Sequence, residues 1–162
     1  MIEEQIIQNW LIDEGFLKEK IVDENANFHY VINYPENNIM DVIQPKGKDG
    51  VVLVGCATQV ADQHLTLMRQ SSEKTKEDFV WNVRFALNKY LVDFDLNVEN
   101  NELRQFVITD EIYDDGLSKH NFIKTIKKVF KAKLECVWLI EQVFGEIDPS
   151  KANPSNENNM FV

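Results

Sequence analysis

The run VVLVGCA at residues 51–57 is apolar at odd and even positions alike. A strand with one face in water alternates apolar and polar side chains, so a run without alternation is typical of a strand covered on both faces. We therefore expect residues 51–60 to form the central strand of a sheet. The chain has 162 residues and is 44% hydrophobic, which is enough to build one core around such a strand.

Two more β-rich runs come before the central strand, at residues 28–34 and 39–44. Turn-forming residues at 35–38 and 45–50 separate the three runs. Short, turn-rich separators favour antiparallel neighbours, because parallel strands need long crossover connections. These runs are therefore predicted to form an antiparallel meander.

A predicted hairpin follows later in the chain. Residues 92–99 alternate strictly between apolar and polar side chains, which is typical of a half-buried strand with one wet, acidic face. A turn at Asn100 and Asn101 leads to a second strand over residues 103–112. The sheet is thus predicted to have five strands, and the charged segment at residues 18–27 is predicted to be a connection.

Helical periodicity marks four segments. The first begins near Ile2 and ends at Gly15, and a short helix over residues 62–68 is predicted to be capped by Asp62. A longer helix is predicted to begin after a cap at Ser71 or Ser72. Its core-facing stripe comprises Phe79, Val83, Ala86, Leu87 and Tyr90.

The last helix is the longest. Ser118 is placed to cap it and Gly145 to stop it, so it is predicted to end at Phe144. A helix of this length spans about 40 Å, enough to cross a whole domain.

The predicted fold class is α+β, an antiparallel five-stranded sheet with helices in the order α-β-β-β-α(α)-β-β-α. Residues 1–145 are expected to form a single domain. Residues 146–162 are polar, rich in asparagine and proline, and expected to be a tail without regular structure. Met160, Phe161 and Val162 at its end are apolar and could dock on the domain.

Three segments carry a resemblance to known proteins: VVLVGCAT at 51–58, EDFVWNVRFAL at 77–87 and FVITDEIYDDG at 106–116. With the element order, they resemble an archaeal family of uncharacterised proteins, which is similar to the group with the type III secretion chaperone fold that includes the YbjN-like proteins. The resemblance covers residues 1–145. It implies a compact α+β domain, often a homodimer, whose best-known relatives hold other polypeptides; it implies no secretion apparatus, and the tail has no counterpart.

Charge and cysteine content narrow the classes of partner and compartment. Lys and Arg number 17 against 27 Asp and Glu, and the net charge of −10 disfavours nonspecific binding to nucleic acid or anionic membranes. Cys56 and Cys136 lie in separate apolar runs, as buried thiols in a reducing compartment do. The sequence has neither a signal peptide pattern nor an apolar stretch long enough to span a membrane. We expect a cytoplasmic protein without a membrane partner.

The sequence offers no convincing catalytic, cofactor or metal site. His29, His64 and His120 lie on different predicted elements, and none has a second ligand at metal-binding spacing on the same helix. Residues 93–104 imitate the first ligands of a calcium loop, but they lack its required glycine and its final glutamate. We therefore predict that the protein is not an enzyme and uses no cofactor.

A small-ligand pocket is the alternative hypothesis. Gly55, Cys56 and Ala57 are small residues in the central strand and could let a ligand approach the sheet, with Asp110 or Glu111 supplying carboxylates nearby. Close packing of a helix requires the same small residues, and paired carboxylates near a turn are more often hydrated than catalytic.

A basic ridge is predicted on the last helix, opposite its apolar stripe. It comprises Lys124, Lys127, Lys128 and Lys131. Such a ridge is most often a solvated face, but it also fits an acidic protein surface, and residues 93–115 of this chain are themselves strongly acidic. Nucleic acid is the least favoured partner, because no aromatic side chains interleave with these lysines.

Trp81 and Phe85 lie one turn apart on the far side of the predicted middle helix from its core stripe. Either another element of the chain covers them, or they form a protein contact such as a dimer interface or client groove. Together with the lysines, they lead to our first hypothesis, a noncatalytic protein-binding or chaperone-like module whose partner is another protein or a second copy.

Overall fold

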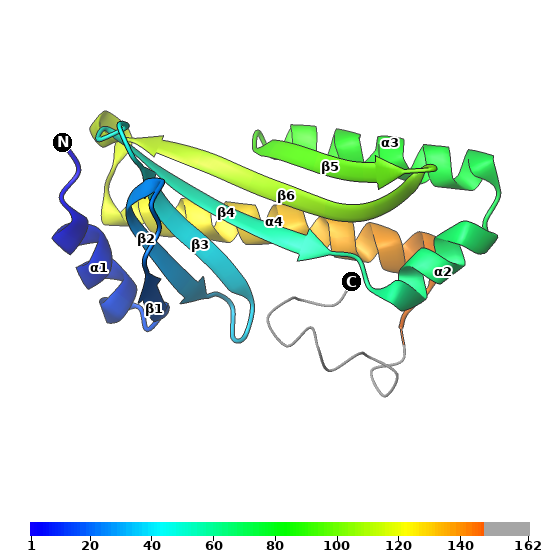
Figure 1. The fold of residues 1–162 in the computed structure, drawn as a ribbon, viewed down its shortest axis with the longest axis horizontal. Helices are drawn as coiled ribbons and strands as arrows, with labels where there is room; N and C mark the ends of the chain where they lie inside the picture. The colour runs from blue at the N-terminus through cyan, green and yellow to red at the C-terminus, as the bar shows by residue number, and fades with distance from the viewer. Residues whose placement is uncertain (148–162) are drawn as a thin grey trace. The chain divides into compact units, whose positions relative to one another are not determined.

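The computed structural model describes residues 1–147. The predictions for residues 148–162, including docking by Met160, Phe161 and Val162, lie outside the described residues. The described elements, labelled in Figure 1, are α1 (Glu4–Asp13), β1 (Leu17–Ile21), β2 (Ala26–Asn33), β3 (Ile39–Pro45), β4 (Val51–Gln59), α2 (Asp62–Gln70), α3 (Glu73–Lys89), β5 (Asp93–Glu99), β6 (Glu102–Tyr113), the 3-10 turn η1 (Asp114–Gly116) and α4 (Lys119–Phe144).

The strands form one six-stranded sheet in the order β1-β2-β3-β4-β6-β5. The α+β class, the antiparallel meander and the interior position of β4 are confirmed. The prediction of five strands is wrong by one, because β1 lies in the segment that we expected to be a connection. β1 pairs only with β2 at the edge of the sheet, and charged side chains between half-buried Leu17 and Ile21 hide its alternation.

The fold divides into two compact units. The first unit comprises residues 1–56 and 109–130, and the second comprises residues 57–108 together with the chain from Lys131 onwards. β4, β6 and α4 each pass from one unit into the other.

The core of the first unit is formed by one face of the meander. Val42 pairs with Val54 across β3 and β4. Alternate residues of β2 and β3 are buried, whereas β4 is buried at successive positions from Val54 to Cys56, as its unbroken apolar run predicts. Helix α1 buries Ile7 and Leu11, while its Trp10 packs against Phe122 of α4 with ring centroids 5.7 Å apart. Helix α1 is therefore amphipathic, as predicted, and its apolar side packs against the core.

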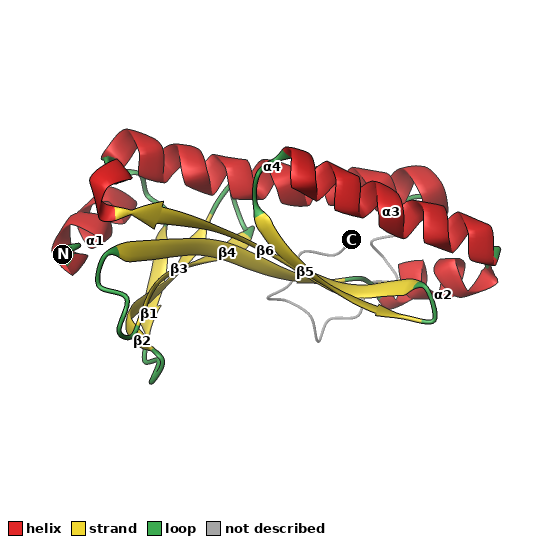
Figure 2. Cartoon of the chain, turned by 90° about the horizontal axis from the view of Figure 1, so that it is seen from above, coloured by secondary structure: helices red, strands yellow, loops and turns green. Residues whose placement is uncertain are grey.

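The core of the second unit lies between two helices and the β5–β6 hairpin. Within this unit, α3 and the later half of α4 lie on the same side of β5 and β6 (Figure 2). Phe79 of α3 contacts Phe144 of α4 with ring centroids 5.0 Å apart, and the rest of the predicted α3 stripe is buried, except that Tyr90 is half-buried.

Local capping signals placed most helix ends correctly. The Ser72 hydroxyl accepts a hydrogen bond from the Thr75 amide, and the Ser118 hydroxyl accepts one from the Asn121 amide. Helix α4 ends at Phe144, before Gly145 with φ of 90°. The cap predicted at Asp62 is wrong, because Ala61 holds that position and makes no side-chain cap.

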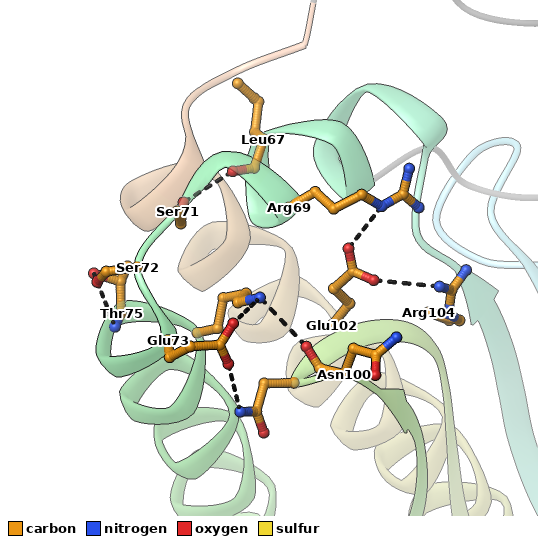
Figure 3. A network of polar contacts seen from close by, with 11 residues as sticks. Leu67, Arg69, Ser71, Ser72, Glu73, Thr75, Asn100, Glu102 and Arg104 are labelled. Atoms are coloured by element: carbon orange, nitrogen blue, oxygen red, sulfur yellow. Dashed lines mark hydrogen bonds and ion pairs between the residues drawn. The ribbon is translucent and has the colours of Figure 1, made fainter.

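A buried carboxylate joins α2 to the start of β6 in the second unit (Figure 3). The side chain of Glu102 is only 3% exposed and accepts hydrogen bonds from Arg69 Nε at 2.8 Å and from an Arg104 terminal nitrogen at 3.2 Å. Two cationic partners offset the loss of water around a buried charge. Glu102 thereby fixes α2 against the hairpin.

The start of α3 is held to the β5–β6 turn in the same cluster (Figure 3). Asn100 and Asn101 form this turn with φ of 54° and 59°, the left-handed conformation that asparagine tolerates. Buried Lys76 reaches Glu73 at 2.8 Å and the Asn100 carbonyl at 3.4 Å, and Asn101 donates to Glu73. The hydrogen bond from Lys76, and after it the one from Asn101, lower the pKa of the Glu73 carboxyl group.

Candidate protein-interaction surface

The outer face of α3 exposes two large aromatic side chains. Trp81 is 47% exposed and Phe85 is 56% exposed, and their rings stack on each other with centroids 5.8 Å apart. The Arg84 guanidinium lies over the Trp81 ring, 4.7 Å from its centroid. Of the two interpretations left open by the sequence, cover by another element does not hold within residues 1–147, where both side chains stay about half exposed. The helix needs Phe79, Val83 and Leu87 inside, so residues on its opposite side face out.

Other large aromatic side chains of the second unit are exposed on different elements. Trp138 on α4 is 58% exposed, and Phe94 on β5 is 36% exposed. A shallow cavity of about 380 Å³ lies beside Phe85 and is closed on its other side by Glu135 and Leu139 of α4. Exposed aromatic groups next to a hollow are typical of protein contacts rather than of plain solvent-facing helices.

The basic ridge on α4 is only partly formed. Lys124, Lys127 and Lys131 are exposed, as expected for such a ridge. Lys128 differs, because its ammonium group pairs with Asp110 of β6 at 2.5 Å within the first unit. The expectation that Lys128 serves the ridge is therefore corrected: β6 offers an acidic partner that the helix sequence alone does not reveal.

The carboxylates near the end of β6 are engaged in local contacts. Glu111 accepts a hydrogen bond from the Tyr113 hydroxyl at 2.9 Å, and Asp114 lies 3.6 Å from the N-terminal amine. Glu111 also lines a cavity of about 360 Å³, together with Gly50 and Val51 at the start of β4. Gly55, Cys56 and Ala57 do not line this cavity. The small residues and the carboxylates of the pocket hypothesis therefore do not meet in it.

His29 lies between two carboxylates in the first unit. Its Nδ1 is 2.9 Å from Asp23 and its Nε2 is 2.7 Å from Asp41. Hydrogen bonds from the Asn25 amide and from His29 lower the pKa of Asp23. Sequence reasoning missed this group because Asp41 becomes a neighbour only through the β2–β3 register.

His64 has a structural role in the second unit. Its ring is fully buried, and Nε2 donates to the Gly145 carbonyl at 2.7 Å, which ties α2 to the end of α4. His120 is exposed at the start of α4. Both cysteines are buried and neither forms a disulfide within residues 1–147, as predicted.

Residues 1–147 contain neither a candidate metal site nor a candidate membrane span. No group of three or more histidine, cysteine, aspartate or glutamate side chains within this range is arranged to hold a metal ion. No helix in the same range combines the length and hydropathy needed to cross a membrane.

Comparison with known proteins identifies relatives by sequence and by shape. A family profile described as "Uncharacterized conserved protein (DUF2299)" matches residues 3–140. The crystal structure of an uncharacterized protein from Methanothermobacter thermautotrophicus has 47% sequence identity and a TM-score of 0.87, and the alignment covers 89% of this chain and 100% of that one. No protein with a curated description matches the chain.

A more distant structure shares the fold. The crystal structure of YbjN, described as a putative transcription regulator from E. coli, has a TM-score of 0.52 and 14% identity, and the alignment covers 85% of this chain and 92% of that one. The resemblances to an archaeal uncharacterised family and to the YbjN-like fold are therefore confirmed at the level of family and fold. At 14% identity, the similarity to YbjN supports a shared fold only.

Proposed function

The chain belongs to the DUF2299 family, and we propose that it is a noncatalytic protein-binding module whose contact surface is the outer face of α3. The observation that carries the proposal is the stacked pair of Trp81 and Phe85, which leaves two large aromatic rings about half exposed on a regular helix. Aromatic side chains in such positions supply much of the binding energy of protein interfaces.

The exposed lysines of α4 support the same class of partner. Lys124, Lys127 and Lys131 are free to attract an acidic protein surface, and this role is electrostatic steering rather than the main source of affinity. The acidic net charge of the chain opposes a nucleic-acid partner. We also propose a cytoplasmic location, because two buried cysteines that form no disulfide within residues 1–147 fit a reducing compartment.

The proposal is tested by replacing both rings with polar groups. We expect Trp81→Ser with Phe85→Ser to abolish the partner complex recovered with the tagged protein from lysate of its source, while the thermal unfolding midpoint stays close to that of the wild type. Trp138→Ser is the matched control, since Trp138 is equally exposed but lies on α4. The control should keep the complex.

Three results would contradict the proposal. A double variant that retains the complex shows that α3 is not the contact surface. A purified protein that retains a bound small molecule, and loses it after Glu111→Gln, would instead favour the enzyme or small-ligand alternative at the cavity beside β4. Recovery of nucleic acid that is lost after Lys127→Glu would favour the nucleic-acid interpretation.

A further inference from the structure

Four exposed residues of α3 form one continuous ridge along the helix: Glu77, Trp81, Phe85 and Lys89. They are spaced four residues apart, and each step of four advances a helix by one turn and about 40°. Such i±4 rows are the ridges by which helices most often pack against each other. The two aromatic rings therefore belong to a ridge with an acid at one end and a base at the other.

The charged ends of this ridge form no salt bridge within the described part of the chain. No salt bridge among residues 1–147 includes Glu77 or Lys89, whereas the neighbouring Lys74 pairs with Asp78 at 2.8 Å. The hydrogen bond from Lys74 to Asp78 is the main cause that raises the pKa of Lys74, and the charge of Glu77 adds a smaller contribution. Glu77 and Lys89 remain available for an external partner.

The order of the ridge is self-complementary when it is read in the reverse direction. Glu77 and Lys89 lie at equal distances along the helix on either side of Val83, and Trp81 and Phe85 do as well. Two antiparallel copies related by a two-fold axis at the level of Val83 place each Glu77 opposite a Lys89. They also place each Trp81 opposite a Phe85.

Other arrangements of the ridge are less favourable. Two parallel copies in register would set Glu77 against Glu77 and Lys89 against Lys89, and like charges facing each other disfavour association. Packing of i±4 ridges on i±4 ridges is the commonest class of helix contact, at a crossing angle of about −50°. At this angle the two ridges run side by side, which suits the antiparallel pairing.

The cavity beside Phe85 offers room for the opposite aromatic ring. It has a volume of about 380 Å³ and includes Phe85 and Lys89 of α3 with Glu135 and Leu139 of α4, all in the second unit. A Trp81 ring from a second copy, placed opposite Phe85, would fill this hollow. Aromatic anchors that enter a pocket are typical centres of protein interfaces.

We propose that the partner at this surface is a second copy of the chain, bound by antiparallel packing of α3 on α3 through Glu77, Trp81, Phe85 and Lys89. The inference rests on the proposed function, because it names the partner of the same surface. It adds a specific pairing, in which the position of each residue in one copy decides which residue it meets in the other.

Charge exchange between the two ends of the ridge tests this pairing. In sedimentation measurements on the full chain, Glu77→Lys and Lys89→Glu should each weaken the dimer by about tenfold or more, because each places two like-charged contacts across the axis. The two changes combined should restore the dimer, because the reversed ridge is again self-complementary. Lys48→Glu, at an exposed lysine in the β3–β4 turn, is the control and should have no effect.

A mixing experiment gives a second, independent readout. Glu77→Lys and Lys89→Glu chains, each poorly dimeric alone, should form a heterodimer when mixed, since every facing pair is then of opposite charge. Acrylamide quenching measured on Trp10→Phe/Trp138→Phe chains should be lower for dimer than for monomer, because Trp81 becomes covered. Trp138→Ser should leave the dimer intact.

The outcomes separate the inference from the proposed function. A monomeric wild type at all protein concentrations, combined with loss of a different protein partner after Trp81→Ser with Phe85→Ser, overturns the second-copy inference and leaves the proposed function in place. A dimer unchanged by the serine changes places the dimer interface elsewhere and overturns the inference. Single charge variants that weaken the dimer without recovery in the combined variant overturn the antiparallel pairing.

Discussion

Two pairs of tryptophan and phenylalanine rings have nearly the same separation but lie in different surroundings. Trp10 and Phe122 join α1 to α4 in the first unit, with ring centroids 5.7 Å apart, and Phe122 is fully buried. Trp81 and Phe85 are 5.8 Å apart on α3 in the second unit, and Phe85 is 56% exposed. A pair that joins two elements is enclosed by them, whereas a pair on one helix is free to meet a partner. The first is expected to stabilise the fold and the second to support association.

The largest expected effect is on the enclosed pair. Phe122→Ala should lower the free energy of unfolding by about 4 kcal/mol, because it removes a fully buried ring and leaves a cavity between α1 and α4. Urea unfolding measured by far-UV circular dichroism gives this value. A loss below about 1 kcal/mol would show that the Trp10–Phe122 contact does not support the first unit.

A second variant asks whether the second unit is loosely packed in general. Phe79 is 1% exposed and contacts Phe144, so Phe79→Ala should cost about 3 kcal/mol in the same unfolding measurement. A cost of this size would show that the second unit has a well-packed core and that the weak packing is limited to the outer face of α3. A small effect would mean instead that the second unit tolerates loss of its core rings.

An enclosed aromatic side chain of the first unit also carries a polar group. The Tyr30 hydroxyl donates to Glu4 at 2.6 Å, and Tyr30→Phe should cost about 1 kcal/mol at neutral pH. Burial, and then the hydrogen bond to Glu4, raise the pKa of Tyr30 above its ordinary value of 10.0. Because the folded state favours the neutral phenol, this contribution is complete below pH 10.0 and is lost as the pH rises above it.

The pH dependence of the unfolding free energy at alkaline pH therefore distinguishes the wild type from Tyr30→Phe. Unfolding free energies measured between neutral pH and about pH 12 should fall more steeply for the wild type than for Tyr30→Phe. Equal slopes would contradict the assigned role of the Tyr30 hydroxyl. Tyr113→Phe serves as the control, since its ring is 59% exposed.

The smallest expected effect is on the exposed pair. Phe85→Ala should change the free energy of unfolding by no more than about 0.5 kcal/mol when the measurement is made on dilute, monomeric protein. The same variant should strongly weaken association in sedimentation measurements. A loss of about 2 kcal/mol or more in the dilute protein would remove the contrast between the two pairs, because it would make Phe85 part of the core.

Features coded by local spacing were predicted well. The unbroken apolar run identified β4 as an interior strand, and Ser72 and Ser118 marked helix starts. Features that depend on a distant neighbour were not predicted. β1 is an edge strand whose charged residues hide its alternation, and Lys128 was expected on a basic ridge although Asp110 pairs with it. The contact of His29 with Asp41 depends in the same way on strand register.

The candidate site shows what a local sequence pattern does not predict, namely whether an outward side chain is covered. Helical periodicity placed Trp81 and Phe85 opposite the buried stripe, but it could not say whether another element covers them. The sequence by itself determined every α-helix and every strand except β1, their order and the inward face of each helix, because periods of two and 3.6 residues are set by the backbone. Only the tertiary structure decided which outward side chains stay exposed, because cover and ion pairs come from residues far apart in the chain.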